Sequence, residues 1–210
     1  MVQERRFEGR ILGVGTASGT RVVVGWWDRS PFGAFADAMV QDVTGRRTLV
    51  APEAVAGFVA STYDFDDVVV AGVRARWHDD ERGAPAVRPG RALLVEGGPL
   101  RLRAVVGRRT WLGGALRLVP ARVATAPAFT LLSDPVARVV LDGVRTRGGA
   151  GGGRRETYGA TDVHAVVGVR ATWDDVGLGA LADVDPPVRF GFGSTPRRPA
   201  LTDVTTTVRG

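Results

Sequence analysis

The chain alternates short runs of apolar and β-branched residues with turns that contain Gly and Pro. Runs in which apolar and polar positions alternate with a period of two are typical of strands. They cover residues 21–27, 68–77, 99–106, 115–123, 162–173, 188–193 and 200–208. The pattern predicts a fold that is built mainly from short strands.

One segment has the spacing of a helix instead. Residues 52–63 place Val55, Phe58 and Val59 on one side of a helical turn pattern, and Pro52 suits the first turn. We therefore predict a helix over residues 52–63.

An internal repeat divides the chain into two halves. Residues 70–77 (VAGVRARW) align without gaps on residues 166–173 (VVGVRATW), with six identities in eight positions. We predict halves 1–107 and 108–210, related by internal duplication and closed into one compact unit. The expected fold class is all-β or β-dominated α+β, with two pseudo-repeated halves forming one barrel or sandwich and one or two short helices.

A period of two also assigns faces to the repeated strand. Odd-numbered residues from Val69 to Trp77, and again from Val163 to Trp173, form an apolar face. Arg74, Arg170 and His164 share the opposite, polar face. The sequence leaves open whether this polar face lines a cavity or meets solvent.

Composition excludes several kinds of chemistry. The chain contains no Cys, and all 28 basic residues are Arg. The chain therefore lacks the Cys needed for a thiolate metal site or a Cys nucleophile. It also lacks the Lys needed for a Schiff base, for pyridoxal phosphate attachment and for a P-loop. We expect no metal and no cofactor.

Charge and hydropathy bear on partners and location. The 22 acidic residues are interleaved with the basic ones, so we do not expect nucleic acid as a partner despite the net charge of +6. No run approaches the roughly 20 apolar residues of a membrane helix, and the first residues lack the pattern of a secretory signal. We expect a cytoplasmic protein without membrane contact, and the oligomeric state stays open.

The repeat also points to a candidate ligand site. At an offset of 96 the predicted helix aligns with residues 148–159 (GGAGGGRRETYG), which we interpret as a mobile Gly-Arg loop. Glycine backbone and Arg side chains together can hold an anion. A flexible surface connector is the alternative interpretation.

The leading functional hypothesis is a binding barrel for a small apolar ligand with an anionic end. At most one of Trp26 and Trp27 can line its cavity, because neighbours on a strand point to opposite faces. The expected ligand-binding residues are Arg147, Arg154, Arg155, Arg170, Arg74, Phe190 and Phe192.

Two other functions compete with this hypothesis. Tyr158, Asp162 and His164 could transfer protons in an enzyme, with the carboxylate orienting the imidazole. A structural or interaction module is the third possibility. The sequence does not rank the three.

Several segments carry a resemblance to known sequences. Residues 30–40 (SPFGAFADAMV), 134–148 (DPVARVVLDGVRTRG), 153–162 (GRRETYGATD) and 186–199 (PPVRFGFGSTPRRP) resemble a protein family of high-GC actinobacteria whose activity is not known. The resemblance implies a bacterial, cytoplasmic setting. It transfers no functional residues.

Overall fold

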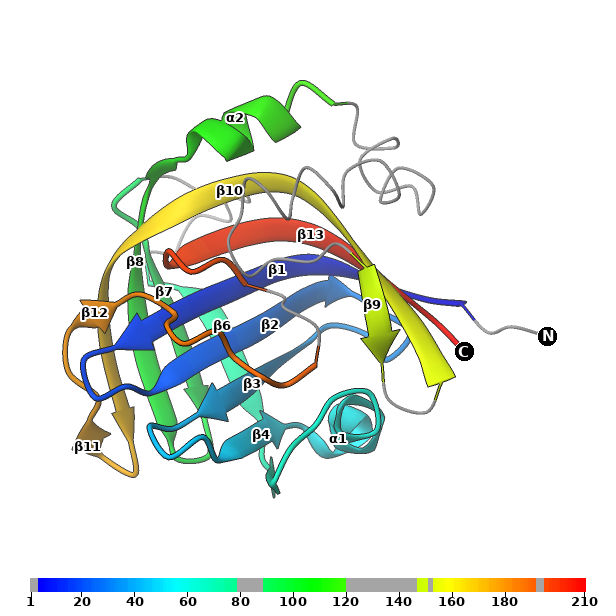
Figure 1. The fold of residues 1–210 in the computed structure, drawn as a ribbon, viewed down its shortest axis with the longest axis horizontal. Coiled ribbons are helices and arrows are strands. Elements are labelled where there is room, and N and C mark those ends of the chain that lie inside the picture. Colours follow the sequence, from blue (N-terminus) through cyan, green and yellow to red (C-terminus); the bar gives the residue numbers. More distant parts are fainter. Residues whose placement is uncertain (1–3, 79–88, 120–146, 151–152, 192–194) are drawn as a thin grey trace.

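A computed structural model of the chain describes residues 4–78, 89–119, 147–150, 153–191 and 195–210 (Figure 1). In these residues thirteen strands form one sheet, accompanied by two short helices. No helix among them is long and apolar enough to cross a membrane. The expected β-dominated fold class is confirmed.

The elements follow one another along the chain in a simple order. They are β1 Glu4–Thr16, β2 Arg21–Arg29, β3 Phe35–Gln41, β4 Arg47–Ala51, α1 Glu53–Ala60, β5 Asp67–Val70, β6 Val73–Trp77, β7 Ala92–Gly97, β8 Leu100–Arg109, α2 Trp111–Leu116, β9 Arg147–Ala150, β10 Arg154–Trp173, β11 Val176–Gly177, β12 Leu181–Ala182 and β13 Ala200–Arg209.

The sheet has the strand order β5-β4-β3-β2-β1-β13-β10-β8-β7-β6, with β9 and β11 paired to β10 and β12 paired to β1. Neighbours are antiparallel except for the parallel pair of β4 and β5. The two end strands, β5 and β6, are joined in the chain by Ala71 and Gly72 alone. The sheet must therefore curl until its ends approach one another, which gives an open barrel.

The larger hydrophobic core lies inside this curl. Leu12 of β1, Val24 of β2, Leu93 of β7 and Leu100 of β8 are all buried there, at 0 or 1% exposure. The face of the sheet that carries these side chains is called the inner face below. Because strand side chains alternate, Trp26 of β2 packs against the inner core and Trp27 packs on the other, outer face.

Helix α1 and the segment of residues 183–191 cover the outer face. Helix α1 buries Val55, Ala56 and Val59 against β4, which confirms the predicted helix. The covering segment is fixed by hydrogen bonds: Arg21 Nη1 donates to the Pro186 carbonyl at 3.0 Å, and the Asp64 backbone N–H donates to the carbonyl of Phe190. A second apolar layer therefore forms outside the barrel.

An irregularity in β10 changes which residues face inward. Tyr158 pairs with Thr206 of β13, but after a register shift between Ala160 and Asp162 the next pair is Asp162 with Asp203. Thr206 and Asp203 lie on opposite faces of β13 because they are three residues apart. The bulge thus directs Tyr158 outward and Asp162 inward.

Some expected elements differ from the structure. Residues 68–77 form two strands, and residues 115–118 belong to α2 and the turn after it instead of a strand. Residues 188–191 lie outside the sheet instead of forming a strand. Their Val188 and Phe190 side chains pack on the apolar outer face of the sheet. The expected odd-numbered apolar face of 163–173 is also broken, since the shifts in β10 leave Val167 62% exposed.

The predicted Gly-Arg loop is wrong in its described part. Gly148, Gly149 and Ala150 belong to β9, which pairs with the start of β10 as an antiparallel ladder. The backbone N–H and C=O groups of glycine can form hydrogen bonds in such a ladder, so a run rich in glycine does not require a loop. The two predicted halves contribute neighbouring strands, such as β1 and β13, to one sheet, and their origin by duplication stays a prediction.

The inner core yields a stability prediction. Replacing Leu93 with Ala removes a fully buried side chain from that core, so we expect a loss of about 2–5 kcal/mol in the free energy of unfolding, measured by urea denaturation. The matched change Leu118→Ala, at a side chain that is 86% exposed, should alter it by less than about 0.5 kcal/mol. Equal effects of the two changes would contradict the assigned core.

Candidate functional site

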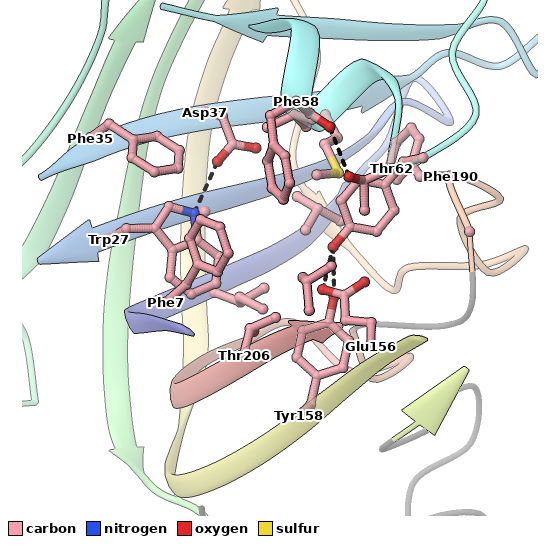
Figure 2. A pocket seen from close by; sticks show the side chains of 18 of the residues that line it. Phe7, Trp27, Phe35, Asp37, Phe58, Thr62, Glu156, Tyr158, Phe190 and Thr206 are labelled. Carbon is pink, nitrogen blue, oxygen red and sulfur yellow. Dashed lines mark hydrogen bonds between the residues drawn. The ribbon is translucent and has the colours of Figure 1, made fainter. Parts of the chain in front are cut away.

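A cavity of about 50 Å³ lies between the outer face of the sheet, α1 and the covering segment (Figure 2). Most of its lining side chains are buried. The lining residues are Phe7, Ile11, Val23, Gly25, Trp27, Phe35, Asp37, Met39, Phe58, Val59, Thr62, Tyr63, Glu156, Tyr158, Val188, Phe190, Gly191, Thr206 and Val208.

Aromatic rings form much of the cavity wall. Phe7 of β1 lies 5.7 Å from the ring of Trp27 and 5.6 Å from that of Phe58 on α1, measured between centroids. Phe190 of the covering segment packs into the same outer core. Sheet, helix and covering segment therefore each contribute an aromatic ring to the lining.

Asp37 of β3 is a buried carboxyl group in this apolar wall. Trp27 Nε1 donates a hydrogen bond to its Oδ1 at 3.1 Å, while Oδ2 has no partner. Burial raises the pKa of Asp37 to about 7, and the Trp27 hydrogen bond opposes this increase. Gly25 makes the pair possible, since a Cβ there would lie 2.6 Å from both bonded atoms.

Glu156 of β10 is the second carboxyl group, and it is 1% exposed. Tyr63 donates to Glu156 Oε1 at 2.6 Å, and the Tyr63 and Tyr158 hydroxyls are 3.0 Å apart. Burial raises the pKa of Glu156 to about 7, and the nearby charge of Asp37 adds to this. Burial and the adjacent Glu156 also raise the pKa values of both tyrosines.

Three buried oxygens in the cavity lack a hydrogen-bond partner. They are Asp37 Oδ2, Glu156 Oε2 and Thr206 Oγ1. Buried polar atoms without partners are rare in folded proteins and cost about 1–3 kcal/mol each. Three of the nine such side-chain atoms found among the described residues line this one cavity, as they would in a ligand site.

Two Arg side chains outside the cavity lining contact the Phe58 ring, which is part of that lining. The guanidinium groups of Arg5 and Arg154 are each 5.1 Å from the centroid of that ring. Arg154 Nη1 also donates to Ser61 Oγ and Thr62 Oγ1, both at 2.9 Å. Arg154 thus ties the start of β10 to the end of α1.

A separate polar cluster faces the inside of the barrel. Asp162 accepts two hydrogen bonds from Arg109 Nε, at 2.8 and 3.0 Å, and its Oδ2 lies 3.5 Å from His164 Nε2. Burial tends to raise the pKa of Asp162, but the Arg109 hydrogen bonds and His164 outweigh it and lower the pKa. Arg10 and Asp203 form a neighbouring ion pair at 3.1 Å. These charges balance one another.

The structure separates the residues that the sequence suggested for proton transfer. Asp162 and His164 do share a face, but the bulge places Tyr158 on the opposite one. A single site made of Tyr158, Asp162 and His164 is therefore wrong. Within the described part of the chain, no group of three or more His, Asp or Glu side chains could hold a metal ion.

The predicted ligand-binding residues fall into three groups. Phe190 lines the cavity beside Trp27 and Tyr158, and Arg154 lies at its rim. The side chains of Arg74, Arg155 and Arg170 are exposed. Arg147 lies in β9 with a side chain outside the described atoms, and Phe192 lies outside the described residues.

Sequence reasoning missed both carboxyl groups of the cavity. Asp37 had a readable signal, since Phe35 and Met39 stand two residues away on either side and place it on an apolar strand face. Glu156 had no comparable signal between Arg154 and Tyr158. Its neighbours Tyr63, after α1, and Asp37, on β3, are remote from it in the sequence.

Comparisons with known proteins do not identify the chain. No family model matches it, and neither the curated proteins nor the solved structures provide a match. The cavity itself is therefore the basis for a functional proposal.

The raised pKa of Asp37 predicts how stability depends on pH. Its folded pKa of about 7 exceeds the ordinary value of 3.8 for this group. The folded state therefore holds the proton more tightly and loses stability as the pH rises from about 4 to 7. Relative to the wild type, Asp37→Asn should gain up to about 4 kcal/mol by pH 8. Urea denaturation at several pH values measures this.

Asp66→Asn is a control of opposite sign. Asp66 pairs with Arg47, and this contact lowers the pKa of Asp66 to about 2. Its contribution to stability is present above its unfolded pKa of about 3.8 and is lost as the pH falls through the folded value. Asp66→Asn should therefore lose stability at neutral pH, and a gain there like that of Asp37→Asn would contradict the assignments.

Proposed function

We propose that the protein binds a small, largely apolar molecule in the cavity beneath α1. The observation that supports this most directly is the meeting of aromatic walls with three unpaired buried oxygens. Ligand sites are typically apolar cavities with a few convergent polar groups and perturbed pKa values. In a core built for stability alone such oxygens are uncommon.

The cavity lining does not favour the anionic end that the sequence suggested for the ligand. Its charged or chargeable groups are Asp37, Glu156 and two tyrosines, and no Arg is among the lining residues. Arg154 stands at the rim and donates hydrogen bonds to Ser61 and Thr62, just after α1. The proposal therefore keeps the apolar ligand and omits its negative charge.

Proton transfer is a second candidate function, now at a different set of residues. Glu156 and Asp37 have pKa values of about 7, which suits a general acid or base near neutral pH. Tyr63 and Tyr158 continue the hydrogen-bonded chain from Glu156. The two functions are distinguished by recovering the bound molecule after incubation, since a binding protein returns it with its mass and structure unchanged.

Filling the cavity tests the binding proposal. Val188→Phe adds a ring to the lining without touching the inner core, so the protein should stay folded but lose binding. We expect at least one of propylamine, 1-propanol and butyrate to shift the Trp27 indole N–H resonance in the wild type. The shift should disappear in Val188→Phe.

Val176→Phe is the matched control for this experiment. Val176 is 67% exposed and lies away from the cavity lining, so this variant should bind as the wild type does. Trp27→Phe assigns the indole resonance. If no compound shifts that resonance in the wild type, or if Val188→Phe binds as well as Val176→Phe, the proposed function is wrong.

A further inference from the structure

We propose that the ligand of this cavity is a small organic cation whose ammonium group lies between Asp37 and Glu156. This inference rests on the proposed function and adds the charge of the ligand to it. It follows from the placement of carboxyl groups, the chemistry of the walls and the size of the cavity.

The first argument is charge complementarity. Asp37 on β3 and Glu156 on β10 both line the cavity (Figure 2), each has one carboxyl oxygen without a partner, and they are 2% and 1% exposed. Asp162, by comparison, lies on the inner face with Arg109 bonded to it. A buried carboxylate without a cation is costly, and an ammonium ion supplies the missing partner.

The second argument concerns hydrogen-bond donors. The titratable groups that face the two carboxyls are Tyr63, beyond the end of α1, and Tyr158 of β10. The Tyr63 proton is already used at Glu156 Oε1, at 2.6 Å. An ammonium ion brings donors and no acceptor, and it therefore matches free carboxyl oxygens better than a carboxylate or phosphate does.

The third argument comes from the walls. Phe7, Trp27, Phe35, Phe58 and Phe190 line the cavity, and the faces of aromatic rings attract cations through their quadrupoles. The Phe58 ring already holds two guanidinium groups at 5.1 Å from its centroid. The same ring contributes to the lining of the cavity.

The volume limits the size of the group that enters. A cavity of about 150 Å³ accommodates benzene, whereas this one has about 50 Å³. It has room for a group of a few heavy atoms, such as the end of a short alkylamine. The rest of a longer ligand would extend past the half-buried rings of Phe58 and Tyr63.

Three compounds with a common propyl chain test the charge. Titrations of propylamine, 1-propanol and butyrate at pH 8, followed by the Trp27 indole resonance, should show propylamine binding at least tenfold more tightly than the other two. Asp37→Asn and Glu156→Gln should each weaken propylamine binding about tenfold while changing 1-propanol binding less than threefold. Both variants retain an oxygen for the Trp27 or Tyr63 hydrogen bond.

The pH dependence separates the alternatives further. Propylamine affinity should rise between pH 6 and 8 as both carboxyl groups lose their protons, and the rise should be smaller in each variant. Tighter binding of 1-propanol or butyrate than of propylamine would overturn the charge assignment and leave the binding cavity intact. Binding of none of the three compounds would overturn the proposed function itself.

Discussion

A single irregularity in β10 determines what the two faces of the sheet can do. Without the register shift between Ala160 and Asp162, strict alternation would place Glu156, Tyr158, Asp162 and His164 on one face. All four polar side chains would then lie on the same side of the sheet. The bulge separates them into a pair outside the barrel and a pair inside it.

The carboxyl groups on the two faces of the sheet have different electrostatic surroundings, and this difference singles out the cavity. Inside, Asp162 has Arg109 and His164 as partners, and the pKa of Asp162 is lowered. Outside, Asp37 and Glu156 face aromatic rings and hydroxyl groups, and burial raises both pKa values to about 7. Contacts with Arg109 stabilise the charge of Asp162, whereas burial destabilises the charges of Asp37 and Glu156.

The sequence allowed much of the fold to be predicted because alternation is a local property. The helix over 52–63 and the opposite orientations of Trp26 and Trp27 followed from spacing within a few residues. Segment 115–118 was misjudged because its alternating Leu and Arg residues also suit the end of a helix such as α2. The covering segment was taken for a strand because its Val and Phe are equally apolar in either role.

The site was harder to predict because its parts meet only in three dimensions. Tyr158, Phe190 and Arg154 were singled out from the sequence, and the structure brings them to one cavity or its rim. Asp37 and Glu156 come from strands that are not neighbours in the sheet. A bulge, moreover, has no sequence pattern as clear as the Gly of a tight turn. The face of the sheet on which Glu156 lies could therefore not be inferred from alternation.

Under the proposed function, the cavity would link ligand binding to the stability of the whole barrel. Asp37 and Glu156 weaken the folded state at neutral pH, because both hold protons more tightly when buried. A bound cation favours the ionised carboxylates and lowers their pKa values, so it reduces this loss in the same pH range where it binds best. Strands β1, β3, β10 and β13 line the cavity with one face and contribute side chains to the inner core with the other. Occupancy of the outer cavity therefore stabilises the strands that enclose the inner core.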